Sequence, residues 1–376
     1  MAIGTDLLTS SHTGREIRQQ PDVWRATARV VAGVRDDVDR QLAAALADPR
    51  TRVVLTGAGT SAFAGEVLAP DLSRLLGRQV EAVATTDLVS APHAALAGGA
   101  PVLLVSFARS GSSPESVAAV EVVDALAPAV HHLVVTCNAD GELARRCADA
   151  PNAVVVTLPP ETNDRGFAMT SSFTSMALAA LLCFGAEVDV DALADVATEV
   201  LDGLADLATG VAATTPRRLV YLGSGPLKGL AHESALKCLE LTAGGLLALG
   251  DSSMAFRHGP KSMLDDQTLA VVYLSGEAGT RAYDEDIAAE LVQALGADRV
   301  AVVDGEEPAA GRWWRVPRRA GWTDAVWALV AVLPAQATAL ACSVAAGRTP
   351  DNPFPGGEVN RVVQGVRIHP LRGGRD

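Results

Sequence analysis

The chain has 376 residues, enough for two α/β domains, and 49% of them are hydrophobic, so we expect a large buried core. Its formal net charge of −13 argues against nucleic-acid binding, which depends on basic patches. An anionic small molecule is not excluded, because backbone N–H groups at a helix N-terminus bind anions even on an acidic protein.

Apolar, β-branched runs alternate with helix-length segments along the chain, which predicts parallel sheets built from βαβ units. The first set of candidate strands comprises 52–56, 79–84, 102–106, 133–136 and 154–158. The second set comprises 218–222, 269–274 and 299–303. The polar segment Thr214-Thr215-Pro216 precedes the second set and predicts a boundary after a helix.

The two halves have the pattern of a diverged repeat. A glycine turn follows the first strand of each half, at 57–61 and at 223–226, and about fifty residues later each half has a strand that ends in serine. The second copy then continues with Glu277, where the first has Arg109 and Ser110. A carboxylate there would repel an anion, so we expect phosphate binding in the first half only. The candidate ligand residues in the two glycine turns are Gly59, Thr60, Ser61 and Ser224.

A hydroxyl-rich turn follows the candidate strand 102–106 and leads into a predicted helix. Its serine hydroxyls and backbone N–H groups could bind a phosphate, and the helix dipole would favour the anion. An ordinary N-cap, formed by Ser112 or Ser113 before Pro114, explains the same serines equally well. The candidate phosphate ligands of this turn are Ser106, Arg109, Ser110 and Ser113.

The first glycine turn could also belong to a dinucleotide-binding site. That fingerprint needs a third glycine at position 62, which is Ala62, and an acidic residue at the end of a strand about 20 residues further on. Glu81 instead falls inside a candidate strand, so we expect no nicotinamide cofactor. No H-x-x-H pair or carboxylate–histidine cluster predicts a metal site, and we therefore expect neither a cofactor nor a metal.

Glu233, Lys237 and Glu240 stand at positions i, i+4 and i+7, which places them on one face of a helix. An exposed ion pair is the usual explanation of such a triplet. Here most of the intervening residues are apolar, which favours a buried helix, and buried charges need a chemical reason. His258 lies in a loop a short distance further along the chain and would become an acid–base group if it lay beside one of these carboxylates.

Five cysteines are scattered without a C-x-x-C pair, which is typical of a reducing cytoplasm and not of a disulfide framework or a zinc site. No basic start followed by an apolar core marks a signal peptide, so we expect a cytoplasmic protein. The uncharged stretch 325–347 contains Pro334 and several polar residues. We interpret it as a buried strand or helix end followed by a helix that begins near Pro334, and not as a membrane span.

Five longer runs are the most specific: 13–21, 161–174, 233–244, 256–262 and 359–365. Together they resemble the double-domain form of the sugar isomerase (SIS) domain family, and most closely its galactosamine-6-phosphate deaminase/isomerase group, also called tagatose-6-phosphate ketose/aldose isomerases. The isomerase half of glucosamine-6-phosphate synthase shares the layout more distantly. The resemblance extends from about Thr13 to His369, nearly the whole chain.

The resemblance implies two flavodoxin-like parallel-sheet domains in tandem, each a three-layer αβα sandwich. We expect an N-terminal helical segment at 1–35 and a first, phosphate-binding domain at 36–200. The second domain, 201–376, would carry the catalytic helix and a C-terminal tail over the site. The protein would be a homodimer or a dimer of dimers that takes a sugar phosphate and neither nucleic acid nor a membrane as partner.

The resemblance also implies roles for individual residues. Glu240 would move a proton between C2 and C1 of the sugar, and Glu233 and Lys237 would flank it and tune it. His258, contributed by the partner subunit according to the resemblance, would open the sugar ring. Ser61, Ser110 and Ser113 would hold the phosphate, and Thr170 or Ser171 would add a contact near the sugar.

Two departures from glucosamine-6-phosphate synthase favour deamination over amino-sugar synthesis. The stretch 360–363 lacks the Schiff-base lysine of that enzyme, and no glutaminase domain precedes the first SIS domain. In addition, Arg109 replaces an uncharged residue and could contact the phosphate directly. The implied reaction converts galactosamine 6-phosphate to tagatose 6-phosphate and ammonia through a 1,2-enolamine. The alternatives are a fructosamine-phosphate deglycase, a ketose/aldose phosphate isomerase of the same family, or a non-catalytic regulator that binds sugar phosphates.

Overall fold

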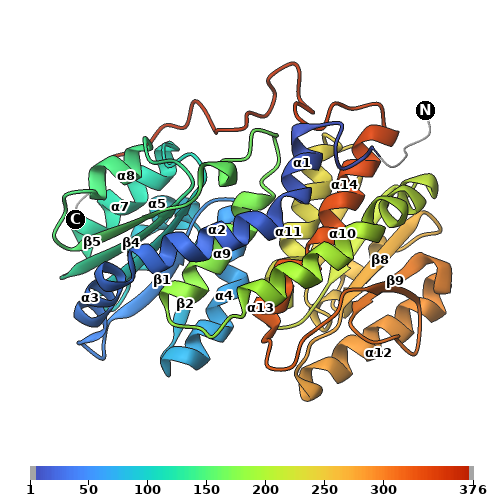
Figure 1. Cartoon of the computed structure of the whole chain (residues 1–376), viewed down its shortest axis with the longest axis horizontal. Coiled ribbons are helices and arrows are strands. Elements are labelled where there is room, and N and C mark those ends of the chain that lie inside the picture. The colour runs from blue at the N-terminus through green and yellow to red at the C-terminus, as the bar shows by residue number, and fades with distance from the viewer. Residues whose placement is uncertain (1–5, 372–376) are drawn as a thin grey trace.

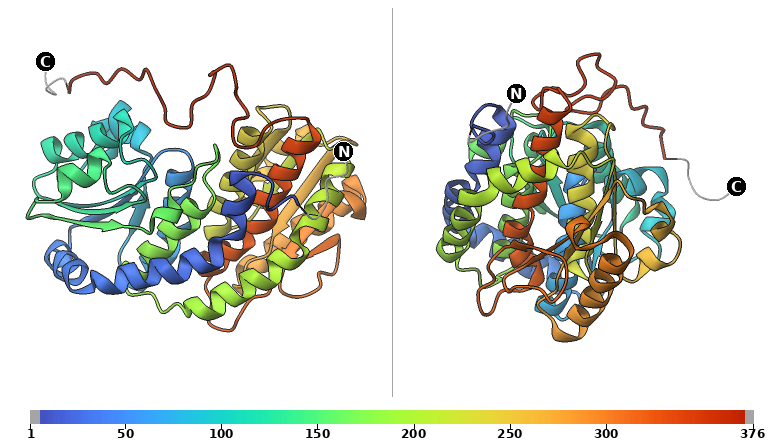
Figure 2. Two further views of the ribbon diagram at one scale, coloured as in Figure 1. Left: turned by 45° about the horizontal axis from the view of Figure 1, so that its top comes forward. Right: turned by 90° about the vertical axis from the view of Figure 1, so that its right-hand side faces the viewer.

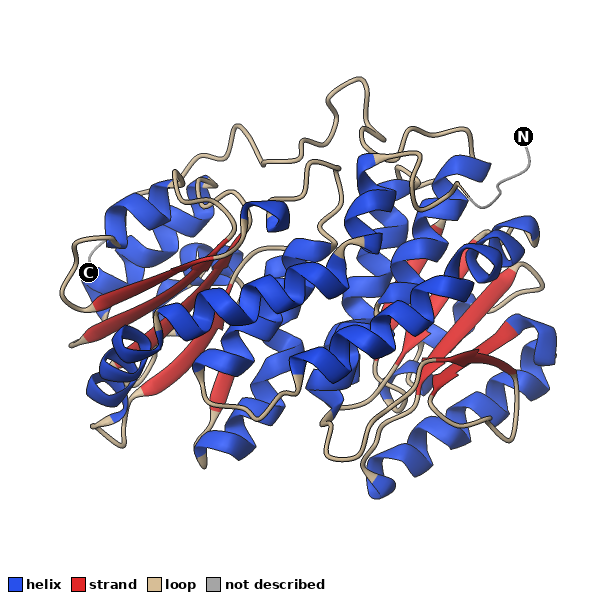
Figure 3. Ribbon diagram, in the orientation of Figure 1, coloured by secondary structure: helices blue, strands red, loops and turns tan. Residues whose placement is uncertain are grey.

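The computed structural model describes residues 6–371 and contains two parallel five-stranded sheets, each with helices on both faces (Figures 1 and 3). The predicted fold of two tandem three-layer α/β units is confirmed. The limits of the segments 1–35, 36–200 and 201–376 stay predictions. Residues 1–5 of the first and 372–376 of the last lie outside the described residues, and the limit at 200 falls inside a helix, α10 (Val190–Ala213).

The first sheet has the strand order β2-β1-β3-β4-β5. Its strands are β1 (Arg52–Thr56), β2 (Val80–Ala82), β3 (Val102–Ala108), β4 (Val130–Thr136) and β5 (Ala153–Thr157), and all five were predicted. The central strand β3 is buried along its whole length, which explains its uninterrupted apolar sequence. Its register pairs Ser106 with Thr56, so the turns that follow β1 and β3 leave the sheet at the same edge.

The second sheet has the order β10-β9-β8-β6-β7. Its strands are β6 (Arg218–Leu222), β7 (Leu247–Asp251), β8 (Thr268–Tyr273), β9 (Val300–Asp304) and β10 (Arg312–Arg315). The three predicted strands are β6, β8 and β9. Strands β7 and β10, which form the two outer edges of this sheet, were not predicted.

The helices of the first part of the chain begin with α1 (His12–Arg18), α2 (Gln20–Gly33) and α3 (Arg35–Leu46) before the first strand. Between the strands and after β5 lie α4 (Thr60–Leu76), α5 (Thr85–Ser90), α6 (Pro92–Ala95), α7 (Pro114–Leu126), α8 (Glu142–Cys147) and α9 (Ser171–Cys183). After α10, the second part contains α11 (Pro226–Leu241), α12 (Ala278–Leu295), α13 (Asp324–Ala331) and α14 (Leu333–Ala345). Single 3₁₀ turns are η1 (Pro160–Thr162), η2 (Ala255–Arg257), η3 (Pro260–Met263) and η4 (Ala297–Arg299).

The largest hydrophobic core lies between the two sheets and joins them into one body. It contains side chains of α4, α9, α10, α11 and α14 together with the inner faces of both sheets. A smaller core covers the outer face of each sheet, under α7 in the first and under α12 in the second. The helices of the central layer therefore have neighbours on several sides, which accounts for helices as apolar as α9.

The uncharged stretch near the C-terminal end consists of two helices, α13 and α14. Of the two structures that we expected before Pro334, the strand is wrong and the helix end is confirmed. Thr323 caps α13 by accepting a hydrogen bond from the Val326 N–H. By length and composition, Asp324–Ala345 could cross a membrane, with a mean hydropathy of 1.8. Because 89% of its most apolar 18-residue window is buried within the protein, its apolar surface is covered by the core.

Helices α4 and α11 pack against each other in antiparallel fashion and bring the two halves together. Thr60, at the start of α4, meets Lys237 near the end of α11, whereas Glu66 meets His232. The two backbones come close at Gly229, where an added Cβ would lie 2.7 Å from the Val67 nitrogen. Glycine at this position thus permits the close approach of the two helices.

After α14 the chain returns as a long extended tail across the top of the first sheet (Figures 1 and 2). Asp351 anchors its beginning to the N-terminus of α1, because its carboxylate accepts hydrogen bonds from the N–H groups of His12 and Thr13, both at 2.8 Å. Segments from both ends of the described chain therefore meet at the start of α1.

Candidate active site

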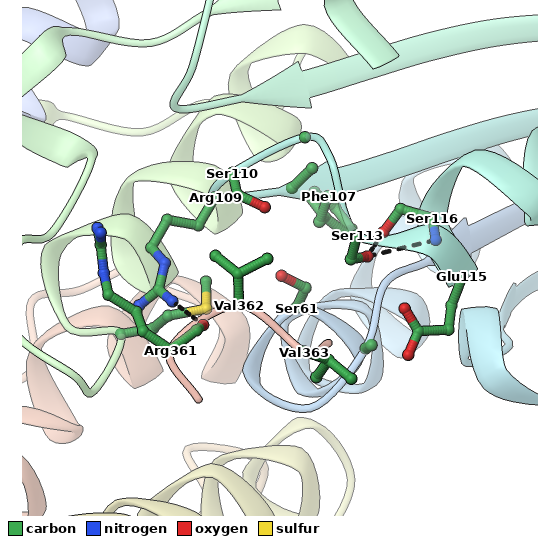
Figure 4. Close-up of a pocket in the computed structure, with 14 residues that line it drawn as sticks. Ser61, Phe107, Arg109, Ser110, Ser113, Glu115, Ser116, Arg361, Val362 and Val363 are labelled. Atoms are coloured by element: carbon green, nitrogen blue, oxygen red, sulfur yellow. Dashed lines mark hydrogen bonds between the residues drawn. The ribbon is translucent and has the colours of Figure 1, made fainter. Parts of the chain in front are cut away.

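A cavity of about 110 Å³ lies at the edge of the first sheet where β1 and β3 end (Figure 4). Ser61 from the start of α4 lines it, as do Arg109, Ser110 and Ser113 from the turn between β3 and α7. The structure thus brings together the serines that were predicted to hold phosphate. The opposite wall comes from Met169 and from tail residues 361–363.

The turn between β3 and α7 places serine hydroxyls at the N-terminus of α7. Gly111 has a φ of +64°, a left-handed conformation that suits glycine. The Ser113 hydroxyl caps α7, because it accepts a hydrogen bond from the Ser116 N–H at 3.3 Å, and it shares a second hydrogen bond with the Ser116 hydroxyl at 2.7 Å. Ser113 is therefore a helix cap and a cavity-lining residue at once, so the two explanations offered for this turn are compatible.

Arg109 connects the walls of the cavity. Its guanidinium is buried and donates to the carbonyl oxygens of Phe167, at 3.1 Å, and Arg361. Arg361 in turn donates to the carbonyl oxygen of Asp164. The two arginines therefore join the β3 turn, the loop before α9 and the C-terminal tail, and at least two donors of Arg109 are engaged by backbone oxygens.

The predicted acid–base face lies near this cavity. Lys237 is fully buried and its ammonium donates to Glu240 Oε2 at 2.6 Å and to Thr60 Oγ1 at 2.9 Å. Glu233 Oε1 lies 3.4 Å from the same ammonium. Thr60 orients Lys237 by accepting its hydrogen bond. The next residue, Ser61, lines the cavity, so the start of α4 contacts both the acid–base group and the cavity.

The electrostatics differ between the two carboxyl groups. Burial raises the pKa of Glu233 to about 8, although Lys237 lowers it, so Glu233 is largely protonated at neutral pH. Burial opposes the charge of Lys237, but Glu233 and Glu240 outweigh it and raise the pKa of the ammonium. The Glu240 side chain is 24% exposed and is the member of the group that a ligand can reach.

Ser224, the predicted ligand residue of the second glycine turn, lies away from the cavity. Ser224 donates to Asp284 at 2.6 Å, in a cluster that also includes Ser253 and the Ser275 N–H. The Ser275 hydroxyl donates to Asp324. Carboxylates of the protein itself, and not the predicted Glu277, therefore accept the hydrogen bonds of these serines. A single phosphate site in the first half stays a prediction.

His258 is not near Glu240 within one chain. It is exposed and follows Phe256, which packs in the outer core of the second sheet under α12. Its neighbours Arg257 and Lys261 both pair with Glu290 of α12. Because α11 covers the opposite face of this sheet, one chain does not bring the predicted acid–base histidine to the carboxylate.

The remaining predicted residues support the walls. Asp164 caps α9 by accepting hydrogen bonds from the Thr170 and Ser172 N–H groups at 2.8 and 2.9 Å, and from the Ser171 hydroxyl. Ser171 also accepts a hydrogen bond from Gln19 at 3.0 Å, so its hydroxyl is engaged within the protein. Ser106 is buried in β3 and does not line the cavity, and Gly59 provides a φ of +56° at the start of α4.

Several residues that line the cavity were not predicted from the sequence. Glu115 and Ser116 follow Pro114 in the predicted helix and were given no role, and Met169 lies inside the run 161–174 that carried the resemblance. Arg361 was noted only because it stands where a lysine was absent. Membership of a long family-like run was the one signal that could have pointed to Met169 and Arg361.

Within residues 6–371, no group of three or more His, Cys, Asp or Glu side chains is arranged to hold a metal ion. The five cysteines are free and buried. The expectation that no metal or cofactor takes part stays a prediction.

The fold and this site together define a double-domain sugar isomerase architecture. Residues 45–185 match the SIS domain family model. A Streptomyces coelicolor protein is 53% identical over 368 residues, which cover 96% of each chain. Its provisional name is D-galactosamine-6-phosphate deaminase AgaS. An Escherichia coli D-galactosamine-6-phosphate deaminase AgaS is 45% identical over 370 residues, again 96% of each chain.

A solved structure of tagatose-6-phosphate ketose/aldose isomerase from Escherichia coli superposes with a TM-score of 0.90. It is 42% identical to this chain, and the match covers 97% of this chain and 98% of the other. The chain therefore belongs to the SIS family, in the group that contains these relatives.

Proposed function

We propose that the protein is an amino-sugar phosphate deaminase/isomerase that converts galactosamine 6-phosphate to tagatose 6-phosphate and ammonia. The observation that carries the proposal is the Glu233–Lys237–Glu240 group beside a hydroxyl-lined anion cavity. The names of the relatives, which are 45–53% identical over nearly the whole chain, support the same substrate.

The reaction follows from these groups once the sugar ring is open. Glu240 removes the C2 proton of the open-chain aldose, and the electron pair moves to form the 1,2-enolamine while O1 gains a proton. Lys237 lies against Glu240 and stabilises the negative charge that develops on oxygen. Return of a proton to C1 gives the ketimine at C2, and water hydrolyses it to the ketose phosphate and ammonia.

The binding roles are also proposals. The phosphoryl group lies on Ser61, Ser110, Ser113 and the N-terminus of α7, which leaves the far end of the sugar toward Glu240. Burial favours the protonated form of Glu233, so Glu240, whose carboxylate contacts the ammonium directly, is the group that supports the charge of Lys237. Because His258 lies on the other face of the second sheet, ring opening by this residue requires a second copy of the chain, and we propose a homodimer with shared sites.

The direct test is ammonia release from a panel of sugar phosphates with purified protein. We expect ammonia and tagatose 6-phosphate from galactosamine 6-phosphate in equal amounts. Ammonia-free conversion of tagatose 6-phosphate to its aldose would favour a simple isomerase, and release of lysine or another amine from a fructosamine phosphate would favour a deglycase. Tight binding of all these compounds without turnover would favour a regulator.

A further inference from the structure

Glu115 is an unexplained carboxyl group in the wall of the cavity. It lies in the first turn of α7, beside the residues that were predicted to hold phosphate. The residue is only 8% exposed, and within residues 6–371 its Oε2 atom is buried without a hydrogen-bond partner. Figure 4 shows the carboxyl group on the cavity side of the helix, turned toward Val363.

A role in helix capping does not account for this atom. An acidic residue in a first helical turn is favoured by the dipole and often closes a capping box from the third helical position. In α7 that position belongs to Ser116, whose hydroxyl pairs with Ser113. The helix start is therefore capped without Glu115, and the buried acceptor stays unused.

The cations that line the cavity do not pair with Glu115. Arg109 donates to the carbonyl oxygens of Phe167 and Arg361, and Arg361 donates to the carbonyl oxygen of Asp164. A buried acceptor without a partner is costly, and native proteins rarely keep one without a use. Because Glu115 lies in the cavity wall, a bound ligand can supply the hydrogen-bond donor that its Oε2 atom lacks within the protein.

We infer that Glu115 is a specificity residue that accepts a hydrogen bond from an O–H group of the phosphate ester bound in this cavity. That the ligand is a sugar phosphate is taken from the proposed function, on which this inference rests. Two sources supply such a donor: the phosphoryl group, which carries a proton near pH 6, and the sugar hydroxyl nearest to it. A sulfate ester of the same shape has no proton to donate from its sulfuryl group, so Glu115 would repel it.

The experiment measures dissociation constants by calorimetry for inorganic phosphate, inorganic sulfate, galactosamine 6-phosphate and galactosamine 6-sulfate, at pH 6.5. We compare the wild type, Glu115→Gln and the control Glu121→Gln, which changes an exposed residue of the same helix. If the phosphoryl group is the donor, the wild type and the control should favour each phosphate over its sulfate by about 10-fold or more, since hydrogen bonds to charged groups are the strong ones. In Glu115→Gln this preference should fall to about 3-fold or less, because an amide also donates to sulfate.

The two sources of the donor give different results. Loss of selectivity with the inorganic ions as well as with the sugar esters assigns the donor to the phosphoryl group. A roughly 10-fold weaker binding of both sugar esters by Glu115→Gln, with inorganic phosphate not weakened, assigns it to the sugar hydroxyl.

Two outcomes overturn the inference: no dissociation constant changes by more than about 2-fold, or all four ligands gain equally from the removal of a negative charge. If Glu115→Gln does not fold, Glu115→Asp withdraws the carboxyl group by one methylene and should reduce selectivity in the same direction. The ammonia assay is separate. A protein whose binding constants respond to Glu115→Gln but which has no turnover would refute the proposed function and leave this inference standing, and an active protein whose binding constants do not respond would do the reverse.

Discussion

Glu240 is the residue on which the proposed chemistry depends, because it is the carboxyl group of the buried triplet that a ligand can reach. Glu240→Gln keeps the shape of the side chain and removes its basicity. We expect turnover to fall by ~10²–10⁴-fold, since that is the usual contribution of a positioned general base. Binding of galactosamine 6-phosphate, measured by calorimetry, should stay within a few-fold of wild type. Near-normal ammonia release by this variant would exclude the role.

Glu233 should make stability depend on pH. Its pKa in the folded protein is about 8, above its ordinary value of 4.5, so the native state holds a proton that the unfolded state has lost between these values. The free energy of unfolding should therefore fall as pH rises from about 4.5 to about 8. Denaturant unfolding of the wild type and Glu233→Gln at pH 6 and pH 9 tests this: the variant should lose less stability over that interval. An unchanged pH dependence would contradict the protonated state of Glu233.

At the level of single elements, the loop before α9 is held from two sides. Glu16 accepts hydrogen bonds from the N–H groups of Arg165 and Gly166, and Arg109 and Arg361 hold the other side. Burial raises the pKa of Glu16 to about 7, with a further contribution from Asp164. The loop carries Met169 into the cavity wall, so the state of Glu16 bears on the shape of the cavity.

Glu16→Gln should therefore loosen this loop locally. The amide keeps one acceptor oxygen, but its NH₂ group cannot accept the second backbone hydrogen bond. We expect faster hydrogen exchange at residues 163–169 and a higher KM with a smaller change in kcat. Exchange in the second sheet is the internal control and should not change. Equal exchange in the loop of variant and wild type would show that Glu16 does not hold it.

The turns after β3 and β8 should respond differently to loss of their hydroxyls. Ser110→Ala with Ser113→Ala should weaken sugar-phosphate binding strongly, because each lost hydrogen bond to a charged group contributes ~1.5–3 kcal/mol. Ser275→Ala should leave binding unchanged and lower stability by ~1–3 kcal/mol, because Asp324 loses a buried donor. Calorimetry and denaturant unfolding of both variants separate the two effects. Weaker phosphate binding by Ser275→Ala would show that the phosphate binds in the second half, contrary to this prediction.

The elements that could be predicted from the sequence are those whose local pattern is determined by burial. The inner strands β3 and β8 are apolar along their length and were found. The edge strands β7 and β10 were missed: β7 contains Gly250 and is mostly only partly buried, and β10 places charged residues at both of its ends. An edge strand pairs on one side only and needs less apolar sequence, so periodicity gives a weak signal for it.

The candidate site was predictable to a similar extent. The triplet Glu233, Lys237 and Glu240 follows from helical spacing, and the serine turn follows from its composition. The cavity wall formed by Arg361 does not, because it depends on contacts between segments nearly 200 residues apart, such as Arg361 with Asp164. The separation of His258 from Glu240 likewise depends on which face of the second sheet each loop packs against.

For the whole molecule, the position of His258 predicts shared sites between two copies. Glu240→Gln and His258→Asn should each be inactive alone. After mixing in equal amounts and subunit exchange, half of the dimers are mixed, and each has one site with both groups intact, so activity should recover to about a quarter of wild type. Exchange is verified by mass spectrometry of differently labelled subunits. No recovery after verified exchange would mean that His258 does not serve a neighbouring chain's site.

The C-terminal tail has a consequence for the biosynthesis of the protein. The first sheet and its serine turn are complete once residue 157 has been synthesised, but the cavity wall waits for residues 361–363. A ligand stabilises a folded state more the more tightly it binds that state, so sugar phosphate should stabilise the emerging first half less than a chain that includes residues 361–363. Substrate should thus protect chains that include these residues from proteolysis more strongly than ribosome-bound intermediates that lack them.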